Sequence, residues 1–117
     1  MKYYFIAGEP SGDMHAANCM SEVLKRDAAA SFAFTGGDLM EAASGKKASI
    51  HIRQMAFMGF AEVLKNIGAI RRNFSIVKKD ILDFKPDVLL LVDYPGFNLR
   101  MAKWATANGI KVEYYIS

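Results

Sequence analysis

The chain has 117 residues, of which 52% are hydrophobic and 23% charged, and its formal net charge at pH 7 is +3. This length fits about one domain, the composition excludes a disordered chain, and the small charge gives no argument for a nucleic-acid partner. A single cysteine excludes an internal disulfide, and no run approaches the ~18 apolar residues of a membrane span, so we expect a cytoplasmic protein that can still contact a membrane surface.

Hydrophobic periodicity and the positions of glycine and proline divide the chain into alternating strands and helices. Because the two types alternate, we predict an α/β fold, a Rossmann-like parallel sheet flanked by helices and joined by right-handed crossovers. In chain order the predicted elements are a strand at 2–7, a helix at 13–25, a strand at 31–35, a short helix at 38–43, a short strand at 49–52, one or two helical turns at 59–65, a long helix at 67–84, a strand at 87–92, a helix at 97–108 and a strand at 110–116.

The first predicted strand runs into the loop Gly8-Glu9-Pro10-Ser11-Gly12-Asp13, which opens a helix. Backbone amides at a helix N-terminus can hold a phosphate or a sugar hydroxyl, and Glu9 favours hydroxyls, hence a sugar over a dinucleotide. The candidate substrate-binding residues here are Glu9, Ser11, Gly12 and Asp13. The alternative is a tight turn in which Ser11 or Asp13 caps the helix, since the loop is not GxGxxG.

A second candidate loop, Gly36-Gly37-Asp38, follows the predicted strand 31–35. We expect this loop to make a turn and to cap the next helix, although the position also lies on the ligand edge of the sheet. His15 and His51 have no cysteine or acidic partner at metal-ligand spacing, so we expect no metal site and no cofactor.

The segment before the long helix combines closely spaced apolar side chains with nearby basic residues. Apolar anchors beside basic residues suit an anionic membrane surface, but core residues beside a solvated basic face are an equally good interpretation. The candidate membrane or acyl-chain contacts are Met58, Phe60, Leu64, Ile67, Arg71 and Arg72.

A carboxylate, Asp93, follows directly on the apolar strand 87–92. Ligands of doubly wound folds bind outside the carboxyl ends of the strands, so Asp93 is placed for chemistry, although an acid at this position also braces turns. Gly96 lets a ligand approach the backbone, and Asn98 offers a donor and an acceptor at the start of the next helix. The pattern favours Asp93 as general base for a hydroxyl nucleophile and Asn98 as a substrate contact.

Four segments carry a family resemblance in their order and spacing: AGEPSGD, TGGDLM, MGFAEVL and KPDVLLLVDYPGFNLR. Together they resemble the N-terminal half of the lipid-A-disaccharide synthases, glycosyltransferases with two Rossmann-like domains in the GT-B architecture. The resemblance covers essentially the whole chain. It implies that 1–117 is an incomplete acceptor-side N-terminal domain, truncated before the C-terminal domain that binds the UDP-sugar.

The resemblance implies inverting transfer of 2,3-diacylglucosamine from UDP-2,3-diacylglucosamine to the 6-hydroxyl of 2,3-diacylglucosamine 1-phosphate, with release of UDP. Asp93 matches the essential aspartate, Glu9 matches a glutamate that helps to hold the acceptor sugar, and 58–72 matches the surface that meets the cytoplasmic face of the inner membrane. Many members have a second acid where this chain has Gly96, which leaves only Asp93 as carboxylate in that motif. The chain alone is expected to bind donor poorly and to turn over negligibly.

Two other functions stay open from the residues. Another membrane-associated two-domain glycosyltransferase, for example one acting on a polyprenyl-linked sugar, uses the same strand-end acids and membrane-facing helices. A non-catalytic Rossmann-like nucleotide-binding module is the alternative from a different class, and the lack of GxGxxG argues against it.

Overall fold

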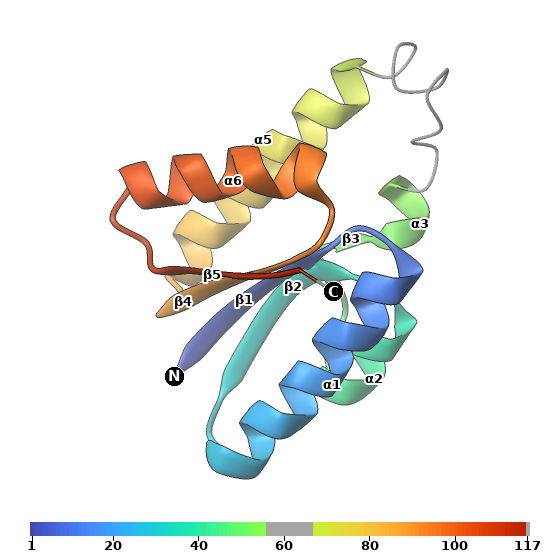
Figure 1. The fold of residues 1–117 in the computed structure, drawn as a ribbon, viewed down its shortest axis with the longest axis vertical. Helices are drawn as coiled ribbons and strands as arrows, with labels where there is room; N and C mark the ends of the chain where they lie inside the picture. The colour runs from blue at the N-terminus through green and yellow to red at the C-terminus, as the bar shows by residue number, and fades with distance from the viewer. Residues whose placement is uncertain (56–66, 117) are drawn as a thin grey trace.

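A five-stranded sheet forms the centre of the computed structural model, which describes residues 1–55 and 67–116 (Figure 1). Neighbouring strands follow the order β3-β2-β1-β4-β5, and all four pairings are parallel. This arrangement confirms the predicted Rossmann-like α/β fold. The strands are β1 Lys2–Ala7, β2 Ser31–Gly36, β3 Ile50–His51, β4 Val88–Val92 and β5 Val112–Tyr115, and the helices are α1 Pro10–Arg26, α2 Asp38–Ser44, α3 Ile52–Met55, α5 Ile67–Phe84 and α6 Pro95–Ala107.

Helices cover both faces of the sheet, α1 and α2 on one and α5 and α6 on the other (Figure 1). Successive side chains of a strand point to opposite faces, so β1 contributes to two cores. Tyr4 and Ile6 lie in the core beneath α5 and α6, whereas Phe5 and Ala7 lie in the core beneath α1 and α2. Burial on both faces explains why β1 and β4 read as continuous apolar runs.

Several element boundaries differ from the prediction for identifiable reasons. The helices α1 and α6 begin at Pro10 and Pro95, three and two residues earlier than predicted, because proline fits the first position of a helix. Helix α5 spans Ile67–Phe84 as predicted, whereas β5 is shorter at both ends. The helical turns predicted at 59–65 lie outside the described residues.

The carboxyl ends of β1 and β4 lie side by side at the middle of the sheet. The chain leaves β1 into α1 on one face and leaves β4 into α6 on the other face (Figure 1). In this class of fold, ligands usually bind at the place where two such connections diverge. Within the described ranges, no helix is both long and apolar enough to cross a bilayer.

Candidate functional site

Asp93 stands at the carboxyl end of β4 in an unusual backbone conformation. Asp93 and Tyr94 have φ of +48° and +51°, so two consecutive residues other than glycine adopt the left-handed region. Each such residue costs about 1 kcal/mol or more relative to ordinary backbone, and persists only where its surroundings hold it. Strain of this kind is concentrated at functional sites.

Hydrogen bonds with other described residues hold the backbone of Asp93. Its N–H donates to the carbonyl oxygen of Tyr115 on β5 over 2.9 Å. Its carbonyl oxygen accepts from the Asn98 side-chain amide over 2.9 Å and from the Tyr114 hydroxyl over 2.7 Å. These bonds involve backbone atoms of Asp93, so they fix the position of its backbone at the carboxyl end of β4.

Asn98 lies inside the protein, with none of its surface exposed. Its side-chain nitrogen also lies 3.3 Å from the carbonyl oxygens of Ile6 and Val92, so one amide ties β1, β4 and α6 together. This geometry indicates a positioning role for Asn98 instead of the substrate contact that the sequence suggested. The burial of Asn98 explains the difference between the predicted and the observed role, because a ligand can contact only exposed atoms.

The loop after β1 meets the loop after β4 through Gly8 and Tyr94. A Cβ atom added to Gly8 would lie 2.6 Å from the Tyr94 ring, so only glycine allows this contact. Burial, and then the negative charge of Glu9, raise the pKa of Tyr94 to about 12. Glu9 itself is exposed. The two acid-bearing loops therefore adjoin at one edge of the sheet, as the strand ends predicted.

The remaining loop residues divide between surface and interior. Ser11 is exposed at the start of α1, where a ligand can reach it. Gly12 is buried, and a Cβ atom there would lie 3.3 Å from the Ala7 side chain. Its small size allows α1 to pack closely on β1, so the geometry indicates a packing role for Gly12.

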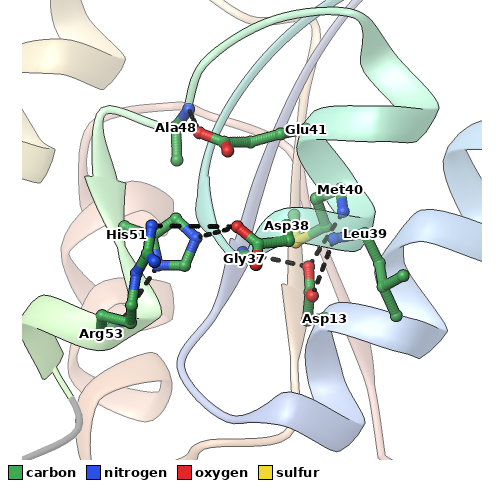
Figure 2. A network of polar contacts seen from close by, with 9 residues as sticks. All are labelled: Asp13, Gly37, Asp38, Leu39, Met40, Glu41, Ala48, His51 and Arg53. Atoms are coloured by element: carbon green, nitrogen blue, oxygen red, sulfur yellow. Dashed lines mark hydrogen bonds and ion pairs between the residues drawn. The ribbon is translucent and has the colours of Figure 1, made fainter.

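Asp13 caps a helix other than its own (Figure 2). Its carboxylate accepts hydrogen bonds from the N–H groups of Gly37 and Met40, each over 3.0 Å, and of Leu39 over 3.1 Å. These are N-terminal donors of α2, which otherwise lack partners in a helix. Only 4% of Asp13 is exposed. The contacts indicate that Asp13 positions the loop after β2.

The capping prediction for α1 is wrong, whereas the loop at 36–38 does supply the N-cap residue of α2, as predicted. Glu9 is the N-cap residue of α1, and within the described residues no side-chain hydrogen bond caps this helix. Gly37 is the N-cap residue of α2, and Asp38 is its first helical residue. Asp13 supplies the cap from α1, 24 residues away from Gly37 in the sequence.

His51 pairs with Asp38 beside this cap, a contact that the sequence reasoning missed (Figure 2). The Nε2 atom of His51 lies 2.8 Å from Asp38 Oδ1, and the Arg53 N–H donates to Nδ1 over 3.1 Å. Since Nδ1 accepts, Nε2 carries the proton and donates to Asp38. This hydrogen bond, with the charges of Arg53 and Lys47, holds the pKa of Asp38 below its usual value.

Asp38, Glu41 and His51 each offer one potential ligand atom, and these atoms lie within 4.8 Å of one another. All three groups are already engaged, however, since Asp38 is the partner of His51. Both ring nitrogens of His51 take part in the hydrogen bonds described above, and Glu41 accepts from the Ala48 N–H over 2.9 Å. The cluster therefore serves to join the loops after β2 and β3.

The predicted membrane contacts are only partly within the described residues. Arg71 and Arg72 are exposed on α5, and Ile67 is the first residue of that helix. Met58, Phe60 and Leu64 lie outside the described residues.

Comparison with known proteins gives consistent matches. Residues 3–117 match the family model described as lipid-A-disaccharide synthetase. Curated lipid-A-disaccharide synthases from Geobacter sulfurreducens, Trichlorobacter lovleyi and Coxiella burnetii are 43%, 45% and 38% identical to the chain over 112 residues. Each alignment covers 96% of this chain but only 29% of the first two relatives and 30% of the third. The chain thus spans less than a third of the length of the relatives it matches.

Proposed function

The chain belongs to the lipid-A-disaccharide synthetase family, and on this premise we propose that it is the acceptor-side part of a glycosyltransferase. In the proposed reaction, 2,3-diacylglucosamine passes from UDP-2,3-diacylglucosamine to 2,3-diacylglucosamine 1-phosphate, with inversion and release of UDP. The observation that carries the proposal is the braced turn that holds Asp93 beside the Glu9 loop at the carboxyl ends of β4 and β1. We propose that a second domain supplies most of the UDP contacts.

Asp93 is the proposed general base. The 6-hydroxyl oxygen of the acceptor forms a bond to C1 of the donor sugar, the bond from C1 to the UDP oxygen breaks, and the hydroxyl proton passes to the Asp93 carboxylate. A positioned base contributes about 10²- to 10⁴-fold to such a step. The hydrogen bonds to the backbone of Asp93 support this role, because they fix the residue at the carboxyl end of β4.

Glu9 and Ser11 are the proposed acceptor contacts. Both are exposed on the loop that adjoins the Asp93 turn, and a carboxylate and a hydroxyl suit the hydroxyls of a sugar. Holding the acceptor there brings its 6-hydroxyl to the base, which lowers the entropic part of the barrier. Gly12, Asp13 and Asn98 act in this proposal by shaping the loops.

The test is transfer by a chimera in which this chain replaces the matching 112 residues of the Geobacter sulfurreducens relative. We expect the chimera to form the disaccharide and UDP from the two lipid substrates, and the isolated chain to form none. A folded chimera without transfer would reject the lipid A substrates. Transfer to a polyprenyl-linked sugar would favour the rival transferase, and tight UDP binding by the isolated chain would favour a nucleotide-binding module.

The acylated substrates suggest where the protein works. We propose that it associates peripherally with the cytoplasmic face of the inner membrane through the start of α5 and the segment before it. The exposed Arg71 and Arg72 support this proposal, because basic side chains beside an interface attract anionic lipids. Replacing Phe60, Leu64 and Ile67 with serine is expected to weaken vesicle association, since it removes the proposed apolar anchors.

The charge contribution gives a sharper measurement. In the chimera, Arg71→Gln with Arg72→Gln is expected to weaken binding to vesicles containing anionic phospholipid by about 30-fold, at about 1 kcal/mol for each arginine. The loss should shrink as salt is added. The matched control is Lys25→Gln with Arg26→Gln, which removes two exposed charges at the end of α1. Equal losses for the two pairs would show that net charge matters and that the position does not.

A further inference from the structure

Tyr114 contacts the candidate catalytic turn from a neighbouring strand. It lies on β5, half-buried, and pairs in register with Leu91 of β4. Its hydroxyl donates to the carbonyl oxygen of Asp93 over 2.7 Å, across 21 residues of sequence. Its ring packs against the core beneath α5 and α6, so the side chain has little freedom to leave this position.

This hydrogen bond acts on the strained peptide unit itself. The carbonyl of Asp93 belongs to the peptide plane between Asp93 and Tyr94, the two residues in the left-handed region. Orienting that plane fixes ψ of Asp93 and φ of Tyr94. Asn98 donates to the same oxygen from α6, so Tyr114 adds a second side-chain anchor, which comes from β5.

The chemistry of the phenol suits a permanent donor. Burial, and then the charge of Asp93, raise the pKa of Tyr114 above its ordinary value. The hydroxyl therefore keeps its proton throughout the physiological range. This effect of the Asp93 charge also indicates that the Asp93 carboxylate lies near the Tyr114 hydroxyl.

We propose that Tyr114 is a positioning residue for Asp93, which holds the left-handed turn in the conformation that aims the carboxylate at the acceptor hydroxyl. This inference rests on the proposed function of Asp93. Positional errors of about 1 Å at a reacting group can cost up to about 10²-fold in rate. The Tyr114 hydroxyl supplies one of the hydrogen bonds to the Asp93 backbone, so its loss is expected to cause part of this decrease in rate.

The experiment removes one oxygen atom from the chimera by Tyr114→Phe. We expect kcat to fall about tenfold, with KM for both lipid substrates within twofold of the parent value. In the Asp93→Asn background, the same change should have no further effect on the residual rate, because Tyr114 acts only through Asp93. Tyr3→Phe is the matched control, since Tyr3 lies near the amino end of β1, away from the carboxyl ends of the strands, and in the described residues its hydroxyl contacts only the Met1 sulfur.

The outcomes separate the two proposals. An unchanged kcat for Tyr114→Phe, or an equal loss with and without Asp93, overturns the positioning role. If Asp93→Asn leaves the rate unchanged, the proposed role of Asp93 fails instead. A second readout does not need activity: amide hydrogen exchange at Phe97 and Asn98, whose N–H groups donate to Tyr94, should become faster in Tyr114→Phe. Unchanged exchange at both amides overturns the proposal even in an inactive chimera.

Discussion

Replacing Asp93 with asparagine in the chimera is expected to slow disaccharide formation by about 10²-fold or more. The amide has the shape of the carboxylate but cannot accept the proton of the acceptor hydroxyl. We expect the fold to be retained, because the hydrogen bonds to the backbone N–H and carbonyl of residue 93 remain possible with asparagine. The measurement is kcat for sugar transfer at saturating substrates, with the unfolding midpoint recorded for each variant.

The control for this prediction is Asp83→Asn. Asp83 is exposed on α5, so the change removes the same charge without touching the Asp93 turn. We expect a transfer rate close to that of the parent. A near-normal rate for Asp93→Asn would remove this residue from the role of base, and an equal loss for the control would assign the effect to net charge.

Asp13 is expected to contribute more to stability than any other polar residue of the loops. The change Asp13→Ala leaves three N–H groups at the start of α2 without their acceptor, and we expect a loss of about 3 kcal/mol or more in the free energy of unfolding. Asp13→Asn keeps an acceptor for Gly37 and Met40 but turns an NH₂ group toward the Leu39 N–H. Its expected loss is about 2 kcal/mol. Denaturant unfolding of the chimera measures both.

The order of the two losses is the discriminating result. The control Glu22→Gln removes a charge from an exposed ion pair with Lys25 on the same helix, and exposed pairs contribute little. If Asp13→Asn and Asp13→Ala are both as stable as the control, the carboxylate does not cap α2. If both retain stability and only weaken binding of the acceptor, Asp13 returns to the role of substrate contact.

Local sequence patterns were sufficient for the elements and for the place of Asp93. The apolar run before it predicts a buried strand, and parallel strands deliver the residues that follow them to one edge of the sheet. The apolar spacing of α5 likewise predicts its face, since Val77 and Ile81 are fully buried. These inferences depend only on residues that are close together in the sequence, so a local sequence pattern is enough to make them.

The capping and pairing contacts depend instead on residues that only the fold brings together. Asp13 looks like the cap of its own helix, but the packing of α1 against α2 turns it toward Gly37. The pairing of β2 with β3 places His51 beside Asp38, which the linear spacing did not suggest. The left-handed backbone of Asp93 is equally hidden, because aspartate at a strand end carries no signal for its φ.

The consecutive left-handed residues at 93 and 94 imply a trade-off between stability and activity. A natural chain could relax this turn by placing glycine at either position, gaining free energy of folding through easier backbone geometry. This chain keeps side chains at both positions, a carboxylate at one and a ring packed on Gly8 at the other. Selection for thermostability alone should therefore favour glycine at residue 94. The variants recovered in this way should have a higher free energy of unfolding and a lower kcat.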